Sequence, residues 1–152
     1  MNIEEAIDRA LESVLDEKIY ISFLRDLKES EKILFFADNC GKVVFDRLSF
    51  VFLDKKIKFV VKDKPTINDA TIYGAIEAGL KGAKNTEIVE MGTGKNVELI
   101  KEEKLQMIIS KGQGNYGTLS EQKGVCFLLI AKCPIIAQDL GASIGSTIFR
   151  KK

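Results

Sequence analysis

The first fifteen residues repeat apolar side chains at helical spacing, while acidic residues and Arg9 occupy the other side. The apolar positions that share one face are Ile3, Ala6, Ile7, Ala10, Leu11, Val14 and Leu15. A period near 3.6 residues predicts an amphipathic helix. A second short helix is predicted to follow, with Phe23, Leu24 and Leu27 on its apolar side. We therefore expect residues 1–30 to form a helical N-terminal segment.

From residue 31 onward the pattern changes, and short apolar runs alternate with segments of helical spacing. The runs that predict strands are residues 33–37, 57–61, 87–91, 106–110, 126–131 and 146–150. Helices are predicted over residues 42–54, 68–80 and 96–103. Strands that alternate with helices at this spacing form βαβ units. We expect residues 31–152 to adopt a three-layer, Rossmann-like α/β fold around a mostly parallel sheet, within a single domain overall.

Length and composition agree with this picture and restrict the class of protein. The chain has 152 residues, of which 45% are apolar and 30% charged, as in an ordinary globular domain. Its 23 basic and 22 acidic residues balance, whereas nucleic-acid and membrane-surface binders normally carry a basic excess. No apolar run approaches the roughly 18 residues of a membrane span, and the acidic N-terminus is unlike a signal peptide. We expect a cytoplasmic protein.

The content of histidine and cysteine limits the available chemistry. The chain has no histidine, which excludes Ser-His-Asp and Cys-His catalysis as well as histidine zinc sites. Its cysteines, Cys40, Cys126 and Cys133, contain no CxxC pair, and we interpret them as free thiols that mainly fill space in a reducing compartment. Any reaction must therefore use carboxylates, amides, lysines, hydroxyls or a metal ion.

Polar clusters follow several of the predicted strands, at the edge where parallel sheets bind ligands. Asp38 and Asn39 follow the first strand, and Asp69 lies one βαβ unit later. Two carboxylates and an amide at one edge would form an all-oxygen site for a hard cation such as Mg²⁺ or Mn²⁺. The alternative is that these side chains cap the helices that follow, a role that also favours acids and amides. Residue spacing alone does not decide between the two hypotheses.

Three lysines, Lys62, Lys111 and Lys132, each follow a predicted strand at the same edge. A surface lysine is usually only solvated, but three of them facing two acids favour a phosphate-ester site. In such a site a metal ion polarises the phosphoryl oxygens, and ammonium groups offset their negative charge.

Two glycine-rich segments match nucleotide-binding loops only in part. Residues 112–117 read GQGNYG and fit G-x-G-x-x-G, but they follow a late strand and the next strand ends in Lys132 instead of an acid. Residues 92–96 read GTGKN, and Val89 stands where a Walker loop needs glycine. A nucleotide-binding α/β domain is therefore the weakest of the functional hypotheses.

Four segments of the chain, in order, resemble the α/β core of the damage-control phosphatases, also called the domain-of-unknown-function 89 proteins. The segments are LFFADNCGKVVFDRL, VVKDKPTINDATIYGAIEAGL, MIISKGQGNYGTLSE and FLLIAKCPIIAQDLG. The resemblance covers roughly residues 15–150, and the ordered set is specific although each segment alone is not.

This resemblance implies a divalent-metal-dependent phosphatase that hydrolyses small phosphate esters, such as sugar phosphates or damaged phosphometabolites. It implies that Asp38, Asn39 and Asp69 bind the metal, which would be Mn²⁺, Co²⁺, Ni²⁺ or Mg²⁺. It also implies that Lys62 and Lys111 act with Asp38 in catalysis. The substrate-binding residues that it implies are Gly112, Asn115 and Lys132.

Two features of this chain depart from the family it resembles. Relatives often carry a glutamate where this chain has Gly117, and they usually carry a substantial helical region before the core. The alternative function is therefore a non-catalytic module that binds phosphometabolites, or a fragment of a longer family member. We expect a second copy to cover the apolar stripe of residues 3–15 in a homodimer, with folding back onto the core as the alternative.

Overall fold

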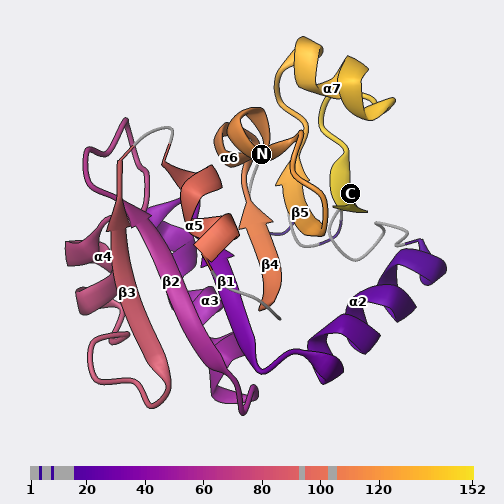
Figure 1. Ribbon diagram of the computed structural model, residues 1–152. Coiled ribbons are helices and arrows are strands. Elements are labelled where there is room, and N and C mark those ends of the chain that lie inside the picture. The colour runs from indigo at the N-terminus through magenta and orange to yellow at the C-terminus, as the bar shows by residue number, and fades with distance from the viewer. Residues whose placement is uncertain (1–3, 5–7, 9–15, 93–94, 103–105) are drawn as a thin grey trace.

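The computed structural model describes residues 4, 8, 16–92, 95–102 and 106–152 (Figure 1). Its elements, in chain order, are α2 (Glu17–Glu29), β1 (Lys32–Phe36), η1 (Cys40–Lys42), α3 (Val43–Val51), β2 (Lys56–Lys62), α4 (Ile72–Glu77), β3 (Thr86–Met91), α5 (Asn96–Glu102), β4 (Gln106–Lys111), α6 (Gln113–Leu119), β5 (Val125–Ile130), α7 (Pro134–Leu140) and β6 (Thr147–Lys151). The apolar stripe predicted over residues 3–15 falls outside the described residues. Within the described residues, no helix is long and apolar enough to span a membrane.

The strands join one sheet in the order β3-β2-β1-β4-β5-β6. Strand β1 pairs in parallel with both β2 and β4, and the pairs β2–β3 and β4–β5 are also parallel. Strand β6 runs antiparallel to β5. The carboxyl ends of the parallel strands therefore lie along one edge, which is the upper edge of the sheet in Figure 1. This arrangement confirms the predicted α/β fold around a mostly parallel sheet.

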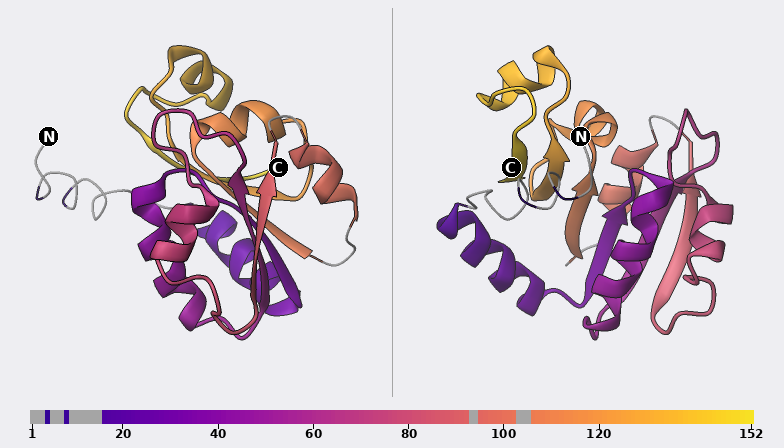
Figure 2. Two further views of the ribbon diagram at one scale, coloured as in Figure 1. Left: turned by 90° about the vertical axis from the view of Figure 1, so that its left-hand side faces the viewer. Right: turned by 180° about the vertical axis from the view of Figure 1, so that it is seen from behind.

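The central strands β1, β4 and β5 are mostly apolar on both faces, as expected where helices cover both sides of a sheet. On one face, Phe35 and Phe59 pack with side chains of α2, α3 and α4. On the other face, Phe36 and Phe127 pack with side chains of α5, α6 and α7. Figure 1 shows α5 in front of the sheet, and the right panel of Figure 2 shows α3 and α4 on the opposite face. The layers are thus helix, sheet and helix.

Helix α2 confirms the second predicted helix and lies against the C-terminal strand. It begins after the N-cap Asp16, whose carboxylate accepts hydrogen bonds from two backbone N–H groups of the first turn. The ring of Phe23 meets that of Phe149 edge-on at a centroid distance of 5.2 Å. Lys151 of β6 forms an ion pair with Asp26. These contacts attach the helix to β6, which is the edge strand on the opposite side of the sheet from β3.

The structure contains two helices that the apolar pattern does not predict. Helix α6 carries two glycines, which disfavour a helix, but its Tyr116 and Leu119 are buried in the core. Helix α7 has Pro134 in its first turn, and Gly141, whose φ is 62°, is its C-cap residue. Proline at the start and glycine after the end are ordinary helix boundary signals. The sequence signals of α7 could have predicted it, whereas α6 depends on tertiary burial.

Candidate functional site

The topological switch point of the sheet lies between β1 and β4. Strands β2 and β3 follow β1 toward one side of the sheet, and strands β5 and β6 follow β4 toward the other. Ligands of open α/β sheets bind beyond the carboxyl ends of the strands at such a point. Asp38 comes after β1 at this edge, and Gly112 comes after β4. The candidate site therefore begins with these two residues.

The backbone of Gly112 lies directly against the side chain of Asp38. A Cβ atom at Gly112 would fall 2.0 Å from Asp38 Oδ1, and the φ of 82° is one that L-residues rarely adopt. Asn115 holds the same region together, because its Nδ2 donates to the carbonyl oxygens of Ala37 (2.8 Å) and Lys111 (2.9 Å). Asn115 is buried, so its amide group ties the end of β1 to the end of β4.

The loop after β2 lies alongside the loop after β1. Asn39 and Asp69 form an isolated antiparallel backbone bridge. Next to it, the N–H of Ala70 donates to the carbonyl oxygen of Asp38 at 2.8 Å. The backbone segments that carry Asp38, Asn39 and Asp69 are therefore side by side, and the two strands that precede them are neighbours in the sheet.

Each of the two carboxylates contacts a lysine. Lys42 Nζ lies 2.8 Å from Asp38 Oδ2, and Lys62 Nζ lies 3.0 Å from Asp69 Oδ2. The same Oδ2 atom of Asp69 accepts a hydrogen bond from the backbone N–H of Thr66 at 3.0 Å. These contacts use Oδ2 of each carboxylate. Lys42 is a residue of the site that the sequence analysis does not single out.

The capping hypothesis accounts for one of the three side chains. Asn39 Oδ1 accepts a hydrogen bond from the backbone N–H of Gly41 at 2.9 Å and caps the short helix η1. The helix predicted from residue 68 begins instead at Ile72, and the hydroxyl of Thr71 caps it. Asp69 therefore does not cap α4, and its carboxylate faces Lys62.

Lys111 forms an ion pair with Asp46 of α3, a residue that the sequence analysis does not identify. Asp46 is only 4% exposed. Burial raises the pKa of Asp46 above its ordinary value of 3.8, and the adjacent Lys111 ammonium group offsets part of this effect. The signal in the sequence is a single acid within the apolar stretch VVFDRLSF, at a helix position that faces the core.

Lys132 lies in the loop after β5, with an exposed side chain. Its backbone N–H donates to Gln113 Oε1 at 3.1 Å, which connects this loop to the start of α6. The predicted residues that follow β1, β2, β4 and β5 are thus distributed along one edge of the sheet.

The side chains of Asp38, Asn39 and Asp69 could supply oxygen ligands, the type that Mg²⁺ and Mn²⁺ prefer. The Asn39 oxygen also accepts the hydrogen bond from Gly41. In the part of the chain that the structure describes, no three acidic or cysteine side chains gather into a potential metal site. The candidate set therefore consists of two carboxylates and one amide. Such a small set suits a cation that keeps several water or phosphate ligands.

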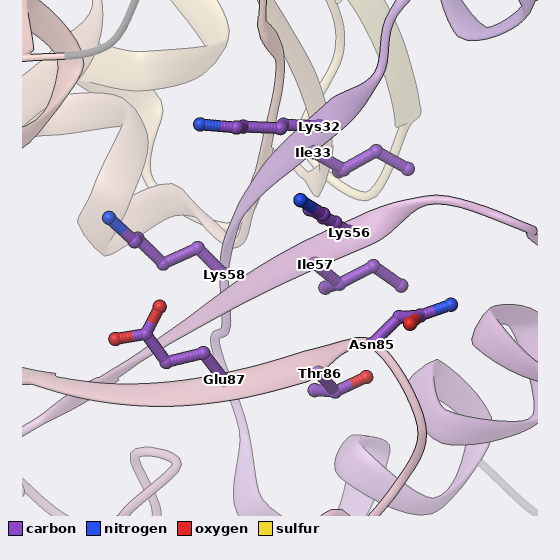
Figure 3. A pocket seen from close by; sticks show the side chains of 8 residues that line it. All are labelled: Lys32, Ile33, Lys56, Ile57, Lys58, Asn85, Thr86 and Glu87. Atoms are coloured by element: carbon purple, nitrogen blue, oxygen red, sulfur yellow. The ribbon is translucent and has the colours of Figure 1, made fainter.

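A pocket of about 410 Å³ lies away from this site, at the amino ends of β1, β2 and β3 (Figure 3). It is lined by Lys32, Ile33, Lys56, Ile57, Lys58, Asn85, Thr86 and Glu87. Figure 3 shows lysine and glutamate side chains near one another, so the pocket is lined by both positive and negative charges. Because parallel sheets bind ligands beyond the opposite ends of their strands, we do not include this pocket in the candidate site.

Comparisons with known proteins support the fold and indicate a family. The damage-control phosphatase ARMT1-like domain matches residues 1–148. The chain is 35% identical over its full length to an uncharacterised protein of Methanocaldococcus jannaschii. It is 33% identical, over 95% of its length, to a damage-control phosphatase of Pyrococcus horikoshii. A crystal structure of a domain-of-unknown-function 89 protein from Pyrococcus horikoshii aligns with a TM-score of 0.78 at 31% identity, over 99% of this chain and 57% of that one.

The relatives are longer than this chain. The chain spans 56% of the length of each of the two curated relatives named above. The family match covers nearly all of this chain, and the solved structure shares its fold at 31% identity. The chain therefore belongs to the damage-control phosphatase ARMT1-like domain family.

Proposed function

We propose that this chain forms the metal- and phosphate-binding part of a divalent-metal-dependent phosphomonoesterase. The observation that carries the proposal is the backbone bridge between the loops after β1 and β2, which brings two carboxylates beside lysine side chains. Membership of the damage-control phosphatase family supports it. The substrates we propose are small phosphate esters, such as sugar phosphates or damaged phosphometabolites.

In this proposal Asp38, Asn39 and Asp69 hold Mn²⁺, Co²⁺, Ni²⁺ or Mg²⁺ through oxygen atoms. A bound divalent cation polarises the phosphoryl oxygens and lowers the pKa of a water molecule. The ammonium groups of Lys62 and Lys111 offset the negative charge of the phosphate ester.

Two of the residues proposed to bind substrate, Gly112 and Asn115, lie next to the end of β1 that carries Asp38. Gly112 brings the backbone close to Asp38, and Asn115 keeps these two strand ends together. Lys132 borders the substrate from the loop after β5. Together these residues would form the phosphate side of the site.

Phosphate release from sugar phosphates and from a generic aryl phosphate tests the proposal. We expect release only with Mn²⁺, Co²⁺, Ni²⁺ or Mg²⁺, and none from Asp38→Asn, which removes a ligand charge without changing side-chain size. The matched control is Asp26→Asn, because Asp26 pairs with Lys151 near the amino end of β5. Unchanged metal-dependent release by Asp38→Asn would show that Asp38 is not a required ligand.

A second candidate is a non-catalytic module that binds phosphometabolites. The observation that favours it is that the chain spans only 56% of the length of its relatives. In that case inorganic phosphate or a sugar phosphate raises the melting temperature, while no ester is hydrolysed with any of the four metals. Stabilisation by NAD instead of phosphate esters would favour a nucleotide-binding domain.

We also propose that the apolar stripe of residues 3–15 forms a homodimer interface. Its support is the helical spacing of large aliphatic residues in the sequence. Light scattering is expected to give twice the mass of the 16.9 kDa chain, and Ile7→Asp is expected to give the monomer. A wild-type monomer at high concentration, with unchanged stability in Ile7→Asp, would refute this interface.

A further inference from the structure

Asp46 is a charged residue in the interior of the protein. It lies on α3 together with Val43 and Phe50, which belong to the hydrophobic core. Its Oδ1 accepts a hydrogen bond from Lys111 Nζ. Its Oδ2 is buried and has no hydrogen-bond partner among the described residues. One oxygen of this carboxylate is therefore unsatisfied, an arrangement that lowers stability.

A contribution to stability does not explain why a carboxylate occupies this position. Buried ion pairs that are replaced by apolar residues of similar volume often give equally stable or more stable proteins. Burial raises the pKa of Asp46, the neighbouring Asp38 adds to the effect, and Lys111 and Lys42 offset it only in part. A buried charge that lowers stability and lies next to a candidate site points to a role in function.

Lys111 links this buried charge to the candidate site. It is the last residue of β4, and the next residue is Gly112, whose backbone lies against Asp38. Its Nζ lies 5.9 Å from the centroid of the Phe35 ring, and its side chain is 19% exposed. The ammonium group is therefore confined by an aromatic ring and a carboxylate, with limited exposure at the edge of the sheet.

We propose that Asp46 is a positioning residue of the candidate phosphate site and that it acts only through Lys111. Its carboxylate fixes the direction of the Lys111 ammonium group, which the Phe35 ring confines on another side. An ammonium group has three N–H donors, so Lys111 can hold Asp46 and still donate to a phosphate oxygen. The inference rests on the proposed function, and it concerns a residue that touches neither the metal nor the substrate.

Four variants test this role: Asp46→Asn, Lys111→Gln, the double variant, and the control Asp26→Asn. The control also removes a helix carboxylate that forms an ion pair with a strand lysine, because Asp26 of α2 pairs with Lys151 of β6. The first measurement is kcat and KM for metal-dependent phosphate release. The second is the concentration of inorganic phosphate that gives half of the maximal rise in melting temperature. We expect Asp46→Asn to lower kcat and to weaken phosphate binding, each by about 10- to 100-fold, as loss of an orienting group does in metal sites.

The double variant decides whether Asp46 acts through Lys111. If it does, adding Asp46→Asn to Lys111→Gln causes no further loss, whereas independent roles give the product of the two losses. A product of losses, or an Asp46→Asn variant equal to Asp26→Asn, overturns the inference. If Asp46→Asn does not fold, Asp46→Ser takes its place in the same comparison. If neither folds, the role of Asp46 is structural and the inference fails.

Phosphate binding and ester hydrolysis by the wild-type chain distinguish a failure of this inference from a failure of the proposed function. A wild-type chain that binds inorganic phosphate but hydrolyses no ester refutes the phosphatase activity. The phosphate-binding comparison then still decides the role of Asp46. A wild-type chain that neither binds phosphate nor hydrolyses an ester refutes both.

Discussion

Asp46 and Lys111 form a buried ion pair in which each charge depends on the other. Their side chains are 5% and 19% exposed, whereas those of Asp38 and Lys42 are 27% and 48% exposed. Removal of Lys111 leaves the carboxylate buried without a counter-charge. Replacement of both residues by apolar ones removes the buried charge altogether. The two changes should therefore have different effects on stability.

We expect Lys111→Met to lower the free energy of unfolding by about 3–5 kcal/mol. The double variant Asp46→Leu with Lys111→Met should regain the wild-type value or exceed it by about 1–4 kcal/mol, because no charge remains buried. Urea unfolding at neutral pH measures both variants. A double variant that is less stable than Lys111→Met alone would contradict this account of the pair.

The cysteine thiols should differ in reactivity. Cys126 is 1% exposed in β5, and burial raises the pKa of its thiol to about 11. Cys40 and Cys133 are partly exposed. Because the thiolate is the reactive form, Ellman's reagent at pH 8 should label Cys40 and Cys133 first and Cys126 only after unfolding. Fast labelling of folded Cys40→Ser/Cys133→Ser would show that Cys126 is accessible. The interpretation of the cysteines as packing residues fits Cys126 best.

At the scale of elements, the β4–α6 junction contains two glycines with different roles. Gly112 has a φ of 82°, and a Cβ there would meet Asp38 Oδ1 at 2.0 Å. Gly114 lies inside α6, and a Cβ there would meet nothing within 4 Å. At Gly114 glycine only weakens the helix, and a larger residue would fit. At Gly112 the backbone conformation and the contact with Asp38 both require glycine.

We expect Gly114→Ala to raise the free energy of unfolding by about 1 kcal/mol, because alanine favours a helix more than glycine does. Gly112→Ala should lower it, since the new methyl group displaces Asp38 and strains the backbone. Thermal unfolding of the two variants provides the comparison. Equal shifts in the same direction would show that the contact between Gly112 and Asp38 has no special importance.

The outer side of helix α3 carries exposed apolar residues beside the polar residues Arg47 and Ser49. Phe50 is 8% exposed, and its ring packs edge-on against Phe35 and Phe59 at centroid distances of 5.1 and 5.7 Å. Phe45 is 70% exposed and Phe52 is 85% exposed. These two rings are exposed in the isolated chain, in contrast to the buried ring of Phe50.

The two sides of α3 can be compared by one pair of substitutions. Phe50→Ala should lower the free energy of unfolding by about 3–5 kcal/mol, because it leaves a cavity among packed rings. Phe45→Ala should change it by less than about 0.5 kcal/mol, because this ring is largely in solvent. Both values come from urea unfolding of the isolated chain. A large loss in Phe45→Ala would mean that its ring is covered in solution.

At the scale of the whole molecule, metal binding should stabilise the fold. A metal at one hundred times its Kd adds about 2.7 kcal/mol to the free energy of unfolding. For a chain of this size, that corresponds to a rise in melting temperature of about 5–10 °C. We expect this rise with at least one of Mn²⁺, Co²⁺, Ni²⁺ and Mg²⁺, and its reversal by EDTA.

The same measurement has matched controls. Asp38→Asn should lose most of the metal-dependent rise, while Asp26→Asn should keep it, because Asp26 lies in a different ion pair. The absence of any rise with all four metals would count against a metal site. So would an equal rise in Asp38→Asn and the wild-type chain.

The sequence by itself determined the strands and the edge that carries the polar residues. Apolar runs bounded by polar residues are a local signal, and they predicted each strand of the six-stranded sheet in the described residues to within about one residue at each end. The position of Asp38 and Asp69 after neighbouring strands follows from the same pattern, because parallel strands place their carboxyl ends at one edge.

Only the tertiary structure decided how these residues are paired. Asp46 and Lys111 are 65 positions apart, and no local pattern relates them, so their ion pair depends on the packing of α3 against the sheet. The same is true of the backbone bridge between Asn39 and Asp69. Helix α6 forms despite its two glycines because Tyr116 becomes buried, and burial of side chains can override weak helix propensity. Long-range packing therefore determined the details of the site, whereas local spacing determined where in the fold it lies.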